Sequence, residues 1–185
     1  MKIQTNSTKY AKVLSLTFIL SLLIGLSLTS EAGITKSEII QAQKEWGKDL
    51  VSVGKAYTEH KDYKEDATEL VNDLYDYQTG EVLFKPTKAS IRPFRKTKKG
   101  AISYFVGHNT NYPQDKGFAL EPWTKVTFKN TGIYIHGNMA MAMGEYFFTP
   151  KKGKAVKVEY TFGYIKNKDG KVKIILHHSS LPYSK

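Results

Sequence analysis

The chain has 185 residues, no cysteine and a formal net charge of +11 at pH 7. Without cysteine, disulfide bonds, thiolate nucleophiles and cysteine-ligated zinc are excluded. The charge is compatible with nucleic acid, an anionic membrane surface or small anions as partners. Because the lysines are scattered rather than gathered on one amphipathic helix, a solvated basic surface is the simplest interpretation.

The first 32 residues have the pattern of a secretory signal peptide. A basic segment with Lys2, Lys9 and Lys12 precedes an apolar run over residues 13–28. Two small residues, Ser30 and Ala32, follow at the cleavage positions. The alternative is an uncleaved anchor, but the run is shorter than the roughly 20 residues of a spanning helix. We expect cleavage after Ala32 and no stable membrane association afterwards.

Export also bears on the location and the partners of the mature chain. A secreted protein without cysteine fits a Gram-negative periplasm, where disulfides are permitted but not required. The segment 1–32 carries a net +2, which leaves +9 on residues 33–185. Export argues against nucleic acid as a partner of this charge, and we expect one domain spanning residues 33–185.

Two helices are predicted at the start of this domain. Thr35 and Glu38 have the spacing of a capping box, and apolar residues recur at helical intervals up to Val53, which predicts a helix over 36–58. A second, shorter and acidic helix is predicted over 63–74.

The period changes to two after Gly80, which predicts strands over 81–86, 102–108, 124–128, 132–148, 156–165 and 172–180. A turn over 166–170, ending in Asp-Gly, joins the last two as a hairpin. The long strand 132–148 contains Gly137 and Gly144, where a strand can bend or bulge. One of its faces carries three methionines, which we interpret as ordinary packing: Met139, Met141 and Met143.

Helices followed by a run of antiparallel strands predict an α+β fold. A long bent strand with long partners favours a strongly curved antiparallel sheet around the N-terminal helices, a cone with a central pocket. The methionine-rich outer strand also suggests a homodimer, because exposed apolar sheet faces are usually covered.

The last predicted strand ends in four polar residues, His177-His178-Ser179-Ser180. Side chains alternate between the faces of a strand, so His177 and Ser179 share one face while His178 and Ser180 share the other. The sequence leaves open which pair faces the pocket. Zinc or manganese remains an alternative, but no HxH or HExxH spacing sets two histidines together, so we expect a site without metal.

Three segments together carry a family resemblance. Residues 83–89 (LFKPTKA), Tyr104-Phe105 and residues 176–182 (LHHSSLP) occur in this order on a chain of helices followed by strands. The combination resembles the iota-class carbonic anhydrases, which belong to the SnoaL-like, calcium/calmodulin-dependent kinase association-domain superfamily with its cystatin-like cone. The resemblance covers nearly all of residues 33–185.

The resemblance implies reversible hydration of CO2 to bicarbonate in the conical pocket. Family members are described both as metal-free and as using zinc or manganese. By position, the resemblance implies that Thr87, Tyr104 and Ser179 bind bicarbonate through their hydroxyls and that His177 is the neighbouring proton carrier. It gives His178 and Ser180 a supporting role, structural or interfacial.

A rival interpretation is a non-catalytic member of the same superfamily. Such a domain would bind another small ligand or serve as an oligomerisation domain, because a fold does not determine a function. The four-residue ending would then be a hydrogen-bonded interface motif.

Overall fold

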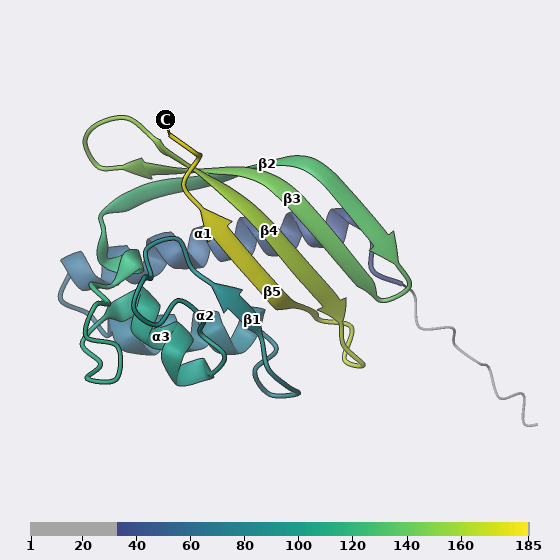
Figure 1. Cartoon of the computed structure of the whole chain (residues 1–185), viewed down its shortest axis with the longest axis horizontal. Coiled ribbons are helices and arrows are strands. Elements are labelled where there is room, and N and C mark those ends of the chain that lie inside the picture. The colour runs from purple at the N-terminus through teal and green to yellow at the C-terminus, as the bar shows by residue number, and fades with distance from the viewer. Residues whose placement is uncertain (1–32, 185) are drawn as a thin grey trace, which may run out of the picture.

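The computed structural model describes residues 33–184 (Figure 1), so the expected signal peptide over 1–32 lies outside the described residues. The elements follow in the order α1 (Lys36–Thr58), α2 (Tyr63–Leu74), β1 (Leu83–Lys85), α3 (Lys98–Val106), the 3-10 turn η1 (Phe118–Leu120), β2 (Trp123–His136), β3 (Met139–Pro150), β4 (Val156–Lys166) and β5 (Val172–Ser180). Within residues 33–184, no helix has the length and apolar character needed to cross a membrane.

The five strands form one curved sheet in the order β1-β5-β4-β3-β2. Strands β2 to β5 are antiparallel neighbours, whereas β1 pairs with β5 in parallel. The α+β fold is confirmed, but the sheet is mixed rather than wholly antiparallel. In Figure 1 the sheet crosses α1, and α2 and α3 lie near the β1 edge.

Both predicted helices have the predicted bounds, and side chains cap their first turns. The backbone N–H of Glu38 donates to Thr35 Oγ1 (3.3 Å), and the backbone N–H of Thr35 donates to Glu38 Oε2 (2.8 Å). This reciprocal pair satisfies two N–H groups that a helix start leaves without partners. Asp62 caps α2 by accepting from the backbone N–H of Glu65 at 3.0 Å.

The strand predicted over 102–108 is wrong, because residues 102–106 belong to helix α3 and the last two residues follow it. Thr97 caps the helix by accepting from the backbone N–H of Gly100, and Gly107 ends it at a positive φ of 67°. Most of its residues are buried, so neither a period of two nor a helical period separates an inner from an outer face. Tyr104 therefore lies on a helix, not on a strand.

The single strand predicted over 132–148 is also wrong. The chain reverses at Gly137-Asn138, so the segment contains the end of β2 and most of β3. Gly137 has a φ of 58°, a left-handed conformation that costs glycine little. The predicted strand 124–128 and residues 132–136 form one strand, β2, interrupted by a bulge between Asn130 and Gly132.

The methionines of β3 do not pack in the core of the single chain. Ala140 and Ala142 face inward and are buried, whereas Met139, Met141 and Met143 are 47%, 55% and 53% exposed. The interpretation of this face as ordinary packing is therefore wrong for one chain. The three side chains form an apolar row on the outer face of the sheet, next to Tyr134 of β2.

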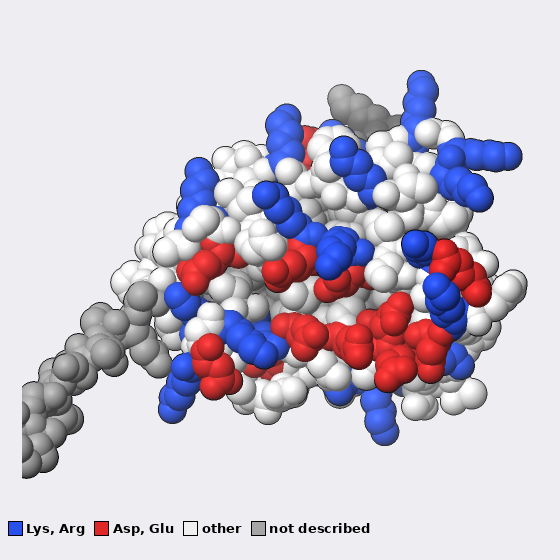
Figure 2. Space-filling view, turned by 180° about the vertical axis from the view of Figure 1, so that it is seen from behind, with Lys and Arg blue, Asp and Glu red and all other residues white. Residues whose placement is uncertain are grey.

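Charges of both signs share the face seen in Figure 2, which lies behind the sheet of Figure 1. Acidic side chains run in bands across its middle, and Lys and Arg side chains border them. Helix α2 contributes acidic residues to the helical layer, with Glu65 and Asp66 in its first turn. The net positive charge is thus mixed with acidic groups on this face, as expected of a solvated surface.

Where β3 pairs with the bulge in β2, we expect substitution to be tolerated at Gly132 of β2 but not at Gly144 of β3. A Cβ on Gly144 would collide with the carbonyl oxygen of Lys129, whereas a Cβ on Gly132 has no atom within 4 Å. Gly144→Ala should lower the free energy of unfolding by about 1–3 kcal/mol, since the backbone must shift. Gly132→Ala, the matched control, should stay within about 0.5 kcal/mol. Urea denaturation measures both; equal stabilities for the two variants would contradict this account of the bulge.

Candidate active site

A bulge in β5 decides which side chains of its polar ending face inward. In β4, the consecutive residues Gly163 and Tyr164 pair with Leu176 and Ile174 of β5. Ile175, which lies between these two, therefore has no partner in β4. Without this extra residue, alternation would put Ile174 and His178 on the same face. With it, Ile174, His177 and Ser179 all face the interior, each 2% exposed.

The parallel pairing of β1 with β5 brings Thr87 to the same end of the sheet. Phe84 pairs with His177 and Lys85 pairs with His178, so the residues after β1 run beside the end of β5. The Thr87 hydroxyl donates to Ser179 Oγ at 3.0 Å, although the two residues are 92 positions apart in the chain.

Tyr104 reaches the same place from α3. Its hydroxyl accepts from the backbone N–H of Lys88 at 3.5 Å. Burial raises the pKa of this phenol, and the neighbouring Lys88 backbone and Thr87 hydroxyl oppose the shift. The structure thus brings together three of the four residues expected in the site: Thr87, Tyr104 and Ser179. They come from a loop, a helix and a strand.

His177 is the fourth expected residue, and it lies behind this group rather than within it. Its Nδ1 is 2.8 Å from the hydroxyl of Tyr75, and its Nε2 is 3.4 Å from the hydroxyl of Tyr146. Burial raises the pKa of the Tyr146 phenol, and the nearby hydroxyls of Ser179 and Thr87 oppose this shift. Tyr146 therefore lies between His177 and the Thr87–Ser179 pair.

Burial determines the protonation states of these groups. It raises the pKa of the Tyr104 and Tyr146 phenols above their usual value, so both keep their protons at neutral pH. Burial also lowers the pKa of the His177 imidazole well below 6.5, with a smaller contribution from His178. The site therefore consists of neutral hydrogen-bonding groups at neutral pH.

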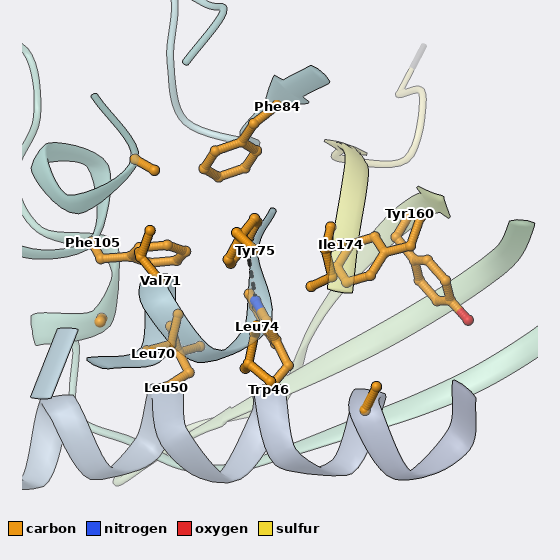
Figure 3. Packing of buried hydrophobic residues seen from close by; sticks show 14 of the residues in the cluster. Trp46, Leu50, Leu70, Val71, Leu74, Tyr75, Phe84, Phe105, Tyr160 and Ile174 are labelled. Atoms are coloured by element: carbon orange, nitrogen blue, oxygen red, sulfur yellow. Dashed lines mark hydrogen bonds between the residues drawn. The ribbon is translucent and has the colours of Figure 1, made fainter. Parts of the chain in front are cut away.

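Trp46 and a ring of aromatic side chains form the back wall of the site. Trp46 lies edge-on to Phe105, Tyr146, Phe148 and Phe162, and 5.6 Å from the ring of His177. Figure 3 shows Trp46 on α1 pointing toward Tyr75, with Phe84 and Phe105 beside them. The space beneath the curved sheet is filled here by aromatic rings, and the polar groups are set among them.

Sequence reasoning missed three residues that belong to this site. Tyr75 and Tyr146 link His177 to its surroundings, and the ammonium of Lys85 donates to the carbonyl oxygen of Ser179 at 3.1 Å. Lys85 could have been found from its position next to Pro86-Thr87 in residues 83–89, one of the segments that carry the family resemblance. Tyr75 and Tyr146 are two of 12 tyrosines, and neither lies in the three segments that carried the resemblance.

A buried ion pair holds α3, and with it Tyr104, against the neighbouring loops. The Arg95 guanidinium donates to Asp115 Oδ1 at 2.6 Å, and the Ser103 hydroxyl donates to Asp115 Oδ2 at 2.5 Å. The Arg95 and Asp115 side chains are fully buried, and the guanidinium also lies over the Tyr112 ring at 4.3 Å. Because a buried charge pair is costly to break, this contact keeps Tyr104 in place.

Tyr104 also lines a hollow that leads to the surface. The hollow has a volume of about 520 Å³, and its wall includes Lys88, His108, Phe118 and Glu121. Lys88 and Glu121 form an ion pair of 3.8 Å at its rim. Tyr104 is thus the site residue that borders this hollow.

His178 and Ser180 lie on the opposite face of the sheet. Both line an outer hollow of about 530 Å³ together with Met143, Glu145 and Thr161. Their separation from Thr87 and Tyr104 agrees with the expected supporting role, structural or interfacial, and leaves that role a prediction.

No group of three or more metal-ligating side chains comes together within residues 33–184. The exposed histidines are spread over two loops (His60, His108) and two strands (His136 of β2, His178 of β5), and His177 is enclosed by aromatic rings. The hydroxyl-rich set around Thr87 does not resemble the nitrogen and sulfur ligands that zinc prefers.

Comparison with known proteins identifies the family of this chain. A family model described as "Metal-independent carbonic anhydrase" (MICAH) matches residues 37–181. A protein of Nostoc sp. (strain PCC 7120) with the same name is 49% identical over 153 residues, which cover 81% of this chain and 75% of the relative.

Two solved structures have a fold similar to that of this chain. The crystal structure of a cyanobacterial iota-carbonic anhydrase complexed with bicarbonate is 47% identical, with a TM-score of 0.80, over 83% of this chain and 95% of that one. A Xanthomonas campestris protein described as a calcium/calmodulin-dependent protein kinase II association domain has a TM-score of 0.55 at 24% identity, over 83% and 96% of the two chains, and supports the fold alone. The resemblance found in the sequence is confirmed: this chain belongs to the metal-independent carbonic anhydrase family.

Proposed function

We propose that this protein catalyses the reversible hydration of CO2 to bicarbonate, without a metal ion, at the site formed by Thr87, Tyr104 and Ser179. The observation that carries the proposal is the 3.0 Å contact between the hydroxyls of Thr87 and Ser179, with the Tyr104 phenol beside them. The contact occurs in a member of a family described as metal-independent carbonic anhydrases, one of whose relatives has been solved with bicarbonate.

Bicarbonate presents three oxygens, and the proposed site offers hydroxyl groups to them. The Tyr104 phenol is kept protonated by burial, so it can donate a hydrogen bond to a developing negative charge on the CO2 oxygens. The Lys85 ammonium donates to the carbonyl oxygen of Ser179, so it adds a positive charge near the bicarbonate. These donors are fixed by the fold before substrate arrives, which is the arrangement that stabilises a transition state at low cost.

Hydration also releases a proton, which must leave the water as its oxygen bonds to carbon. A hydroxyl group can accept this proton and at the same time donate its own proton to the next group. No residue is then left with a charge after the reaction. The net products are bicarbonate and a proton delivered to bulk solvent. The hollow beside Tyr104 provides the path for CO2 and for this proton.

The purified protein without residues 1–32 should hydrate CO2 in stopped-flow measurements, and the rate should survive treatment with a metal chelator. Activity that disappears with the chelator and returns with zinc or manganese would contradict the metal-free mechanism. No rate above that of the buffer, with or without metal, would favour the alternative of a non-catalytic ligand-binding or oligomerisation domain.

Among single variants, Ser179→Ala and Tyr104→Phe should each lower kcat/KM at least tenfold, about 1.4 kcal/mol of barrier. Ser180→Ala is the matched control for Ser179: it removes the next hydroxyl along β5, which lies on the outer face. It should keep at least half of the activity. Equal losses at Ser179 and Ser180 would mean that we have assigned the wrong face of β5.

We further propose a homodimer formed through the outer face of the sheet. The apolar row of Met139, Met141 and Met143 with Tyr134 is exposed in the single chain, and a second copy would cover it. Met141→Glu should then shift the molar mass in solution, measured by light scattering, from that of two chains to that of one. Lys44→Glu, at an exposed position of α1 away from the outer face of the sheet, is the control. A monomeric wild-type protein would refute the proposal.

We also propose that the chain is exported to the periplasm and cleaved after Ala32, on the basis of the basic, apolar and small-residue pattern of residues 1–32. The mass of the protein recovered from the periplasmic fraction of a Gram-negative host should correspond to a chain that starts at Gly33. A full-length chain in the membrane fraction would support the uncleaved anchor instead.

A further inference from the structure

The ring nitrogens of His177 each have one hydrogen-bond partner, and the rest of the ring is enclosed. Phe84 stacks on the ring at 4.5 Å, and Phe162 packs against it at 4.1 Å between centroids. Tyr75 lies at Nδ1 (2.8 Å) and Tyr146 at Nε2 (3.4 Å). The imidazole therefore cannot turn to another partner without opening the core.

The orientation of these hydrogen bonds follows from counting protons. The indole N–H of Trp46 can only donate, and it donates to the Tyr75 oxygen at 2.8 Å (Figure 3). The one hydroxyl proton of Tyr75 remains, and His177 Nδ1 is the acceptor within reach among the described residues. If Nδ1 carried the imidazole proton, the Tyr75 hydroxyl proton would be buried without an acceptor, which is energetically costly.

The imidazole is neutral, because burial lowers its pKa well below 6.5. A neutral imidazole carries one proton, so a bare Nδ1 places that proton on Nε2. Nε2–H then donates to the Tyr146 oxygen, and the Tyr146 hydroxyl proton is left to donate to Ser179 or Thr87. The chain of donors runs from Trp46 toward the substrate site.

We propose that Tyr75, held by Trp46, is a positioning residue that fixes His177 as the Nε2–H tautomer, so that the imidazole donates to Tyr146 and orients its hydroxyl toward Ser179 and Thr87. The effect on catalysis rests on the proposed carbonic anhydrase function, whereas the tautomer does not. This arrangement changes the role that the resemblance implies for His177. An imidazole with a proton on Nε2 cannot accept another from Tyr146, so it acts as a fixed donor, and the proton released by hydration leaves on the side of Tyr104.

The tautomer can be measured directly by NMR of protein labelled with ¹⁵N at histidine. The ring signals of His177 can be assigned by elimination, because the other four histidines are exposed and we expect them to tolerate substitution by asparagine: His60, His108, His136 and His178. We expect a protonated Nε2 and a bare Nδ1 that persist from pH 6 to pH 9. A protonated Nδ1, or a doubly protonated ring at pH 7, would overturn the proposal whatever the activity of the enzyme.

Tyr75→Phe tests the role of the phenol. It removes the donor to Nδ1 and should give a mixture of tautomers, with kcat about tenfold lower and KM changed less than twofold. Tyr77→Phe is the matched control: Tyr77 stacks on Tyr75 and donates its hydroxyl to the carbonyl oxygen of Arg95 at 2.6 Å, without contact to His177. It should change neither the tautomer nor kcat.

An unchanged tautomer in folded Tyr75→Phe would refute the inference. A changed tautomer in a protein that has no activity even as wild type would leave the positioning intact and reject the proposed function.

Discussion

One unpaired residue in β5 determines what the rest of the site can be. Ile175 has no partner in β4, and this bulge shifts the register so that Ile174 and His177 face the same side of the sheet. A shift of one residue exchanges the two faces of a strand. Without the bulge, a core anchored on Ile174 would turn His178 and Ser180 inward and leave Ser179 on the outer face, away from Thr87.

The hydrophobic core and the polar site are one structure in this protein. The aromatic rings around Trp46 exclude water, and the same exclusion raises the pKa of the Tyr104 and Tyr146 phenols and lowers that of His177. Hydrogen bonds are stronger in such surroundings, and an unpaired polar group there is expensive. The chain from Trp46 through Tyr75, His177 and Tyr146 satisfies its members one after another, so the core specifies the direction of each bond.

Where the sequence predicts the wrong element, the physical cause differs from one element to another. Helix α3 was mistaken for a strand because tertiary contacts bury it on several sides, which removes the polar face that marks a helical period. The turn at Gly137-Asn138 was missed because apolar residues continue on both sides of it, although Gly-Asn is a hairpin signal. Helices α1 and α2, by contrast, have one buried face and clear caps, and their bounds were predicted correctly.

Local patterns were enough to predict the first two helices, the last hairpin and the segments of Thr87, Tyr104 and Ser179 that carry the family resemblance, because each depends on residues close together in the chain. Tertiary structure alone decided which half of His177-His178-Ser179-Ser180 faces inward, since a bulge depends on the pairing partner. It also brought Tyr75 and Tyr146 to the two nitrogens of His177 from positions 102 and 31 residues away. No local pattern encodes such contacts, because they exist only once the sheet has curved over α1.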